Sequence, residues 1–357
     1  MKEEILFLNL LRFFAALNVV GSHKFETLLS MGYLPAFLQM FSSLAQYGYL
    51  GVDLFFMISG FVIMLSSEGR TVGQFALARF MRLYPMFWVC ISITTIIAVL
   101  ANTQHISLGQ YLAGLTMVPD TFGAFAYIDG VYWTLEIELR FYFFVALLLG
   151  LRKFMKVDIQ KVAVFLSFML AIHMMFHVAK STSVLAILFG IFYTIYWTGY
   201  AQYFLAGILF YGIYQNSKRK YHYVAIFLCY LVAIVQAFSR TYESNNKIIV
   251  ALFITTFFIL FLILSLRKIT NTSFSFLGKH YRKIIITLGA ITFPLYLLQN
   301  SVIGILLQLF TTYKIPPYLA SPLLFFLVLI ILLLVNRIDV YINRVVLKRK
   351  HEVSTTT

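Results

Sequence analysis

An arginine and a histidine lie in the first membrane-length apolar stretch, and their spacing would allow proton chemistry inside a membrane. Arg12 and His23 are eleven positions apart, so on a helix they are offset by about 20° around the axis and about 16 Å along it. Histidine takes a proton from a hydroxyl near neutral pH, and a cation in hydrocarbon normally faces a protein interior. We expect the first span to line a functional site. The alternative is that His23 reaches the interface and Arg12 pairs with a buried carboxylate.

A second constellation is the sequence GVDLFFMISGF, Gly51 to Phe61, which places a carboxylate in the second apolar stretch. Asp53 lies about two turns inside the predicted outer boundary, and Gly60 shares its face and permits close helix approach. Asp53 could orient and charge-stabilise His23, which makes it a catalytic candidate. The alternative, which the residues alone favour, is a structural ion pair with Arg140.

A third constellation is WTLEIELRFY, Trp133 to Tyr142, which opens the fourth apolar stretch. Glu136 and Arg140 have the i, i+4 spacing of a helical ion pair. Glu138 points elsewhere on the helix, so it is predicted to be an unpaired carboxylate roughly 9 Å below the outer surface. Such a group suits proton transfer. The alternatives are a partner for Arg12 or an interhelical hydrogen bond.

A fourth constellation is TVGQFALARFMRLYP, which joins the second and third apolar stretches. Thr71 and Gln74 have capping-box spacing, so they are predicted to open a short interfacial helix, with Pro85 at the start of the next span. Arg79 and Arg82 are three apart and share a face, which suits a nucleotide phosphate bound from the cytosol. The alternative is an ordinary basic loop that contacts lipid phosphates.

The composition predicts an all-α protein that crosses a membrane many times. Hydrophobic residues make up 61% of the 357 residues, charged residues make up 11%, and apolar runs of about 20 residues recur. The net charge of +15 is assigned to loops beside a membrane, so no nucleic-acid partner is expected. We predict one transmembrane domain over 1–348 and a flexible cytoplasmic tail at 349–357. The ten predicted spans are 5–23, 47–67, 83–101, 132–151, 161–178, 199–215, 222–239, 247–266, 284–307 and 319–340.

The basic residues predict the orientation of these spans. Of the 28 Lys and Arg residues, five lie opposite the N-terminal side, two lie within spans, and the other 21 lie on the N-terminal side. This bias predicts that both termini are cytoplasmic. The apolar stretch Val184–Trp197 is assigned to a bent or interfacial element, because an extra span there would invert every later loop. Cys90 and Cys229 fall in predicted spans and are too few for a disulfide framework, and no metal is expected.

Together these motifs resemble the integral-membrane acyltransferase 3 family, whose members O-acylate extracytoplasmic glycans and some lipids. The resemblance covers essentially the whole chain. It depends on the spacing of Arg12 and His23, on GVDLFFMISGF, ARFMRLYP and WTLEIELRFY, and on a weaker match at ITFPLYLLQN, Ile291 to Asn300. Their order and their topological positions make it specific.

The resemblance implies a role for each matched residue. His23 would be the catalytic residue, with Arg12 as its companion and Glu138 as the glutamate of a WSLxxExxFY-like motif. Arg79 and Arg82 match the arginines that meet acyl-coenzyme A at the cytoplasmic face.

The chain also departs from the family pattern at several positions. Thr134 replaces the usual serine, and Glu136 and Arg140 add charges where polar neutral residues are common. Gln299 stands where many members have histidine, which puts in doubt any proton-transfer role for the C-terminal motif.

We therefore expect a multi-pass enzyme of the bacterial inner membrane. It would move an acyl group, with acetyl favoured, from cytosolic acyl-coenzyme A to a hydroxyl of an extracytoplasmic or lipid-linked glycan. Its expected partners are membrane lipid, that glycan and glycan-assembly proteins. Two alternatives stay open: a proton-coupled secondary transporter or flippase, which would use the same buried charges, and a non-catalytic subunit of a glycan-assembly complex.

Overall fold

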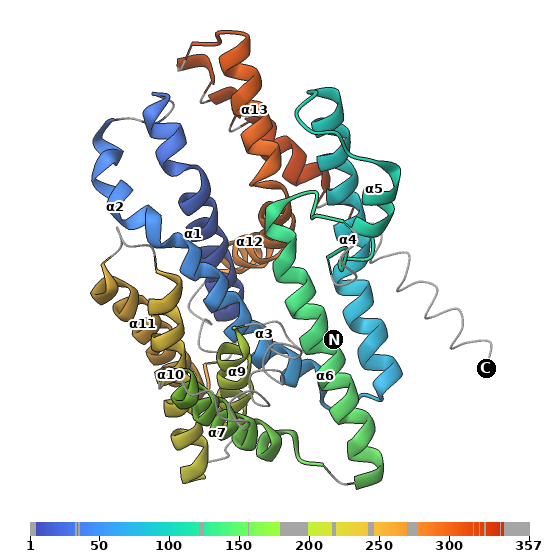
Figure 1. Ribbon diagram of the computed structural model, residues 1–357, viewed down its shortest axis with the longest axis vertical. Helices are drawn as coiled ribbons and strands as arrows, with labels where there is room; N and C mark the ends of the chain where they lie inside the picture. Colours follow the sequence, from blue (N-terminus) through green and yellow to red (C-terminus); the bar gives the residue numbers. More distant parts are fainter. Residues whose placement is uncertain are drawn as a thin grey trace, which may run out of the picture. The chain divides into compact units, whose positions relative to one another are not determined.

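The computed structural model in Figure 1 shows a protein built from α-helices and short 3-10 turns. It describes residues 5–32, 34, 36–120, 125–155, 157–178, 199–215, 219–241, 246–269, 278–316, 318–320, 322–324, 326–335 and 337–338. No strand occurs in these residues, which confirms the predicted all-α class. Two features of the prediction, the stretch at 184–197 and the tail at 349–357, lie outside the described residues.

The principal helices follow one another in the order expected for a polytopic membrane protein. They are α1 (Leu6–Ser30), α3 (Gly51–Ser67), α4 (Val72–Leu100), α5 (Leu108–Gly114), α6 (Trp133–Met155), α7 (Ile159–Val178), α9 (Ala201–Tyr214), α10 (Lys220–Arg240), α11 (Lys247–Leu266), α12 (Lys279–Leu298) and α13 (Ser301–Thr312). Shorter elements are η1 (Ala36–Phe41), α2 (Ser42–Ala45), η2 (Gln46–Leu50) and η3 (Gly130–Tyr132).

Eight segments of the described chain are long and apolar enough to cross a membrane, so the protein is a multi-pass membrane protein. Of the other predicted spans, α6 carries several charges within its first two turns, and α9 is only 14 residues long. The eight segments are Leu6–Phe25, Phe37–Ser67, Val72–Leu100, Ile159–Phe176, Lys220–Arg240, Lys247–Leu266, His280–Leu298 and Tyr318–Val335.

Two predicted boundaries are wrong. The ninth span, 284–307, is not one helix, because α12 ends at Leu298 and α13 begins at Ser301. The reason is local: the backbone N–H of Ser301 donates to the Asp129 carboxylate at 2.8 Å instead of continuing the ladder of α12. The short interfacial helix expected before Pro85 is also absent as a separate element, because α4 runs through Pro85 without a break. A proline inside a membrane helix is tolerated where its neighbours satisfy the freed carbonyl.

The chain folds as two compact units, which are described separately. Unit 1 comprises Met1–Val19, Gln46–Leu77 and Leu135–Ile286. Unit 2 comprises Val20–Ala45, Ala78–Thr134 and Thr287–Thr357. Helices α1, α4, α6 and α12 each contribute residues to both units.

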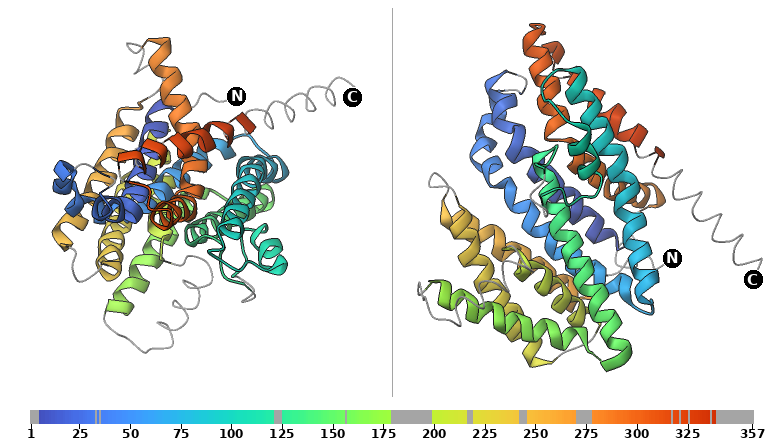
Figure 2. Two further views of the ribbon diagram at one scale, coloured as in Figure 1. Left: turned by 90° about the horizontal axis from the view of Figure 1, so that it is seen from above. Right: turned by 45° about the vertical axis from the view of Figure 1, so that its right-hand side comes forward.

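Helix α9 forms the centre of unit 1. It packs against α3, α7, α10 and α11 (Figures 1 and 2), and its residues from Ala201 to Ile213 are all buried, as expected for a helix that is apolar on every side. Its closest contact is with α3. A Cβ atom at Gly60 would lie 2.2 Å from the Phe204 carbonyl oxygen, and one at Gly207 would lie 2.2 Å from the Met57 carbonyl oxygen. The predicted close helix approach at Gly60 is therefore confirmed.

Unit 2 contains a loop that folds back along a helix. The indole Nε1 of Trp88 donates to the Leu115 carbonyl oxygen at 3.0 Å, and the hydroxyl of Tyr84 donates to the Thr116 carbonyl oxygen at 3.0 Å. Tyr84 lies about 24 Å from the Leu100 end of α4 by helix rise. Helix α5 and Leu115 and Thr116 after it therefore lie beside α4 (Figures 1 and 2), and the two aromatic side chains of α4 satisfy the backbone carbonyls of Leu115 and Thr116.

Candidate functional site

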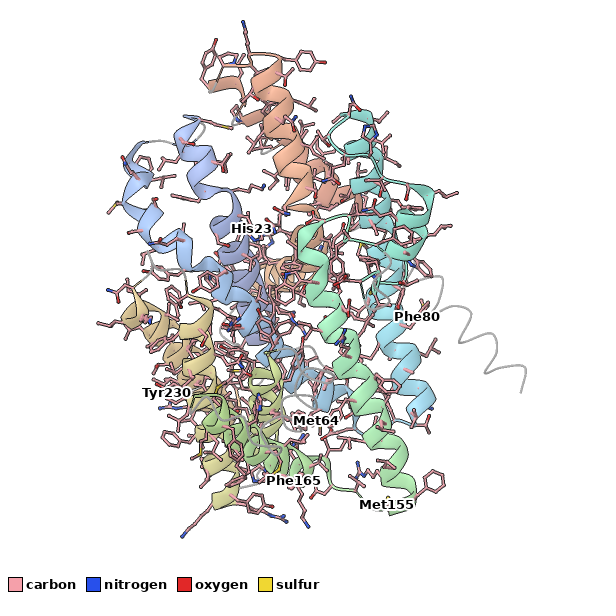
Figure 3. All side chains as sticks on the ribbon, in the orientation of Figure 1. His23, Met64, Phe80, Met155, Phe165 and Tyr230 are labelled. Carbon is pink, nitrogen blue, oxygen red and sulfur yellow. The ribbon has the colours of Figure 1, made fainter. Side chains whose placement is uncertain are left out.

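The candidate site is centred on His23, where α1 meets the junction of α12 and α13 in unit 2. The imidazole Nδ1 lies 2.9 Å from the amide nitrogen of Gln299 and 3.3 Å from its amide oxygen. Gln299 is only 1% exposed and occupies the turn between the two helices. Figure 3 shows His23 toward the Ser30 end of α1. The structure thus ties the histidine to the C-terminal motif, 276 positions away in the sequence.

A buried carboxylate organises the same region. Asp129 is 1% exposed, and its Oδ1 accepts hydrogen bonds from the Asn300 amide at 2.9 Å and from the Val131 N–H at 3.0 Å. Its Oδ2 accepts the Ser301 N–H, so one carboxylate caps both η3 and α13. Asp129 also interacts electrostatically with Lys24 and with His23. No pattern in the sequence marks this residue, because a lone aspartate in a connecting segment has no spacing signal.

The start of α6 is attached to α12 by hydroxyl groups. The Oγ1 of Thr134 and the Oη of Tyr296 are 2.9 Å apart, and the Tyr296 hydroxyl also reaches the Val131 carbonyl oxygen at 3.3 Å. The motifs WTLEIELRFY and ITFPLYLLQN therefore meet in unit 2, although they are more than 160 positions apart. Thr134, which replaces the serine of the family pattern, supplies one of these hydroxyl groups. Together with Asp129, these contacts fix the turn that carries Gln299.

Helix α1 carries both residues of the first predicted pair. It runs without interruption from Leu6 to Ser30, so Arg12 and His23 lie in one helix as predicted, and the helix continues seven residues beyond the predicted end at 23. Arg12 is half-buried. Its role beside His23 stays a prediction.

Asp53 has structural partners in unit 1. It is fully buried, and two nitrogens of the Arg240 guanidinium each lie 3.1 Å from its Oδ1. The Tyr203 hydroxyl donates to Oδ2 at 3.1 Å, and the guanidinium lies 4.5 Å from the centre of the Tyr200 ring. The ion-pair interpretation is therefore the one that the structure supports, but the expected partner, Arg140, is wrong. The catalytic role suggested for Asp53 would require its carboxylate to act while it holds these bonds.

The predicted pair on α6 is present and the predicted isolated carboxylate is not. Glu136 and Arg140 form an ion pair one helical turn apart, which confirms the spacing argument. Glu138 was expected to be unpaired, but its Oε1 accepts hydrogen bonds from the Ser59 hydroxyl at 2.9 Å and from the Tyr142 hydroxyl. Ser59 belongs to α3, so the interhelical alternative is the one observed. Both donors reach the same oxygen, and no described residue donates to Oε2.

The two arginines assigned to donor binding lie in the first half of α4. The capping box is confirmed: the Thr71 N–H donates to Gln74 Oε1 at 3.1 Å, and the Gln74 N–H donates to Thr71 Oγ1 at 3.3 Å. Arg79 is half-buried and Arg82 is exposed. Figure 3 shows their neighbour Phe80 on the part of α4 remote from the α13 side, whereas His23 lies near α13. Within unit 2, Phe80 therefore lies farther from α13 than His23 does.

No metal centre is apparent in the described residues, which contain no group of three or more His, Cys, Asp or Glu side chains close enough to hold an ion. Cys90 and Cys229 are buried free thiols. Among the described side chains, the Gln299 amide contacts the His23 ring, and the Lys24 ammonium and the Asp129 carboxylate interact with it electrostatically. This set of groups suits hydrogen bonding and proton transfer.

The fold and the site define a class, a polytopic helical membrane protein with a histidine held at a helix junction. The sequence matches the acyltransferase domain family, acyltransferase 3, over residues 5–337, so the chain belongs to that family and is a membrane acyltransferase. A segment of 102 residues is 33% identical to the exopolysaccharide production protein ExoZ of Rhizobium meliloti (strain 1021). That segment covers 27% of this chain and 32% of ExoZ, so the chain matches about a third of this relative. No solved structure matches the chain.

Proposed function

We propose that this acyltransferase moves a short acyl group, with acetyl favoured, from cytosolic acyl-coenzyme A to a hydroxyl of an extracytoplasmic or lipid-linked glycan. The reaction would take place in a bacterial inner membrane, with both termini of the enzyme in the cytoplasm. The observation that carries the proposal is the setting of His23. Its Nδ1 is held by Gln299, and no described residue donates to or accepts from its Nε2. Nε2 is thus available to a substrate.

The chemistry proposed for His23 has two routes. As a general base, Nε2 takes the proton of the acceptor hydroxyl while that oxygen attacks the thioester carbonyl. The carbon–sulfur bond breaks, and the coenzyme A thiolate takes the proton back from the imidazole. As a nucleophile, Nε2 attacks the thioester carbonyl, the carbon–sulfur bond breaks, and the thiolate leaves the acyl group on the imidazole. The acceptor oxygen then attacks this acyl carbonyl, the bond to Nε2 breaks, and the hydroxyl proton passes to the thiolate. Both routes end with an ester and free coenzyme A.

The donor would bind by its phosphates at Arg79 and Arg82. Arginine forms bidentate bonds to phosphate, and two arginines one turn apart on α4 present such groups side by side. The pantetheine arm would extend from there between the helices toward His23, with Arg12 steadying the arm or helping to form the passage. Glu138 would take part in proton transfer through Oε2, since its other oxygen holds α3 and α6 together.

A glycan acceptor is supported by the partial similarity to ExoZ, a protein named for exopolysaccharide production. The carrier alternative loses part of its support, because two of the buried charges it would use, Asp53 and Arg140, are held in ion pairs. Family membership also favours group transfer over transport. Glycan-assembly proteins are the expected partners.

The test is acyl transfer in cells that express matched variants. His23→Ala should remove the acyl group from surface glycans, as measured by mass spectrometry, while the protein remains inserted. His105→Ala is the control, since it is the same change at an exposed histidine outside the candidate site. Normal acylation by the His23 variant would refute the proposed chemistry.

A further inference from the structure

We propose that Gln299 is a positioning residue that holds His23 through Nδ1, so that Nε2 is the nitrogen that reacts. The inference rests on the proposed function, since it concerns the same histidine. It assigns a task to the C-terminal motif, which sequence analysis left without a role in proton transfer.

The surroundings of the Gln299 side-chain amide favour its contact with His23 Nδ1. The Gln299 backbone N–H donates to the Leu295 carbonyl oxygen at 3.1 Å, which fixes the residue at the end of α12. It forms part of the wall of a small pocket that is otherwise lined by aliphatic residues such as Leu298, Val302 and Val328. Within the described residues, His23 is the side chain that bonds this amide. An amide in an apolar wall is costly unless it is hydrogen-bonded, so the contact should be retained during turnover.

An amide suits a histidine that changes protonation state. The Gln299 amide reaches Nδ1 with both ends, the nitrogen at 2.9 Å and the oxygen at 3.3 Å. A half-turn of the amide exchanges the two, and we assign the oxygen as the end that accepts a hydrogen bond from a protonated Nδ1. This tautomer leaves the lone pair of the neutral ring on Nε2. When Nε2 takes a proton from the acceptor, Nδ1–H stays bonded to the same oxygen, and the imidazolium keeps its orientation. Gln299 thus fixes the ring without adding a charge. Among the residues that the structure describes, the charged groups near the ring are Lys24 on α1 and Asp129 before η3.

The experiment compares two substitutions of similar length. Gln299→Met removes both polar atoms, and we expect kcat to fall about 10- to 100-fold with an unchanged KM for acyl-coenzyme A, the size of effect typical of residues that orient a metal-bound histidine. Gln299→Glu keeps an acceptor for Nδ1–H, so it should retain kcat within about tenfold. Its carboxylate favours the imidazolium, so the acidic limb of the pH–rate profile should move to higher pH. Gln308→Met, at an exposed glutamine of α13, is the control.

A purely structural role would not move the pH profile, and equal losses in folded Met and Glu variants would overturn the proposal. A wild-type rate for Gln299→Met would overturn it as well. If the Met variant does not fold, the tautomer is measured directly in the wild-type enzyme by nitrogen-15 NMR of labelled histidine. A proton on Nδ1 supports the proposal, and a proton on Nε2 of the neutral ring contradicts it. Loss of transfer in His23→Ala with normal transfer in Gln299→Met would refute this inference and leave the proposed function intact.

Discussion

Arg240 holds Asp53 by three short contacts, two to Oδ1 at 3.1 Å and one to Oδ2 at 3.2 Å. Arg240 belongs to α10 and Asp53 to α3, so the pair joins two helices of unit 1. The two residues are 187 positions apart in the sequence. The carboxylate is fully buried, and each of its oxygens has a partner. This geometry is that of a structural ion pair.

Removing one partner should therefore destabilise the fold. Arg240→Gln leaves a buried carboxylate without its countercharge, a change that typically costs about 3 to 5 kcal/mol. We expect a lower melting temperature in detergent and less folded protein. The double variant with Asp53→Asn should recover part of the loss, because it removes the uncompensated charge. Simple additivity of the two single effects would contradict the pairing.

The contact between α3 and α9 predicts a second stability effect. Gly60→Ala places a methyl group 2.2 Å from the Phe204 carbonyl oxygen, so the helices must separate. Overpacking of this kind costs about 1 to 3 kcal/mol. Gly73→Ala is the matched control, because nothing lies within 4 Å of its Cβ position in α4, and it should be neutral or stabilising by roughly 0.5 to 1 kcal/mol. Equal thermal stability of the two variants would show that the α3–α9 contact is looser than described.

Glu138 has a structural role through Oε1, which accepts two hydrogen bonds, and a proposed proton-transfer role through Oε2. One substitution can separate the two roles. Glu138→Gln keeps an acceptor oxygen for Ser59 and Tyr142, but an amide takes no proton at working pH. We expect the melting temperature to stay close to wild type while acyl transfer falls about 100-fold or more. Ser59→Ala, which removes one donor to the carboxylate, should change transfer far less. Normal turnover by Glu138→Gln would remove this residue from the catalytic scheme.

Donor binding should depend on the two arginines of α4. Replacing Arg79 and Arg82 by Ala should weaken binding of radiolabelled acyl-coenzyme A at least tenfold, because each arginine is expected to form charge-assisted bonds to phosphate. Affinity for the glycan should stay near wild type. The charge-matched control replaces Arg267 and Lys268, two exposed basic residues after α11, by Ala. A donor affinity equal to that of the control would place the phosphates elsewhere.

Local patterns in the sequence predicted the helices and the contacts within them. The capping box of Thr71 and Gln74 and the pair of Glu136 and Arg140 follow from helical spacing alone, and both are present. Apolar length also identified the membrane helices. The break at Gln299 escaped notice, because an apolar run continues on both sides of it.

Contacts between distant segments could not be predicted from spacing. Asp53 has several arginines available to it, and only the packing of α3 and α10 against α9 selects Arg240. The contact of His23 with Gln299 spans 276 positions, and the amide of a glutamine gives no signal in a single sequence. The family resemblance indicated that His23 is important, but it did not indicate that Gln299 contacts its ring.

The proposed arrangement places donor recognition and hydroxyl activation on opposite sides of the membrane. It is tested most directly by single cysteines introduced at Ser30 and at Ala76, both exposed positions, in a variant that lacks Cys90 and Cys229. An impermeant maleimide added to intact spheroplasts should label position 30 and should reach position 76 only in inverted vesicles. Labelling of both positions from the same side would contradict the account.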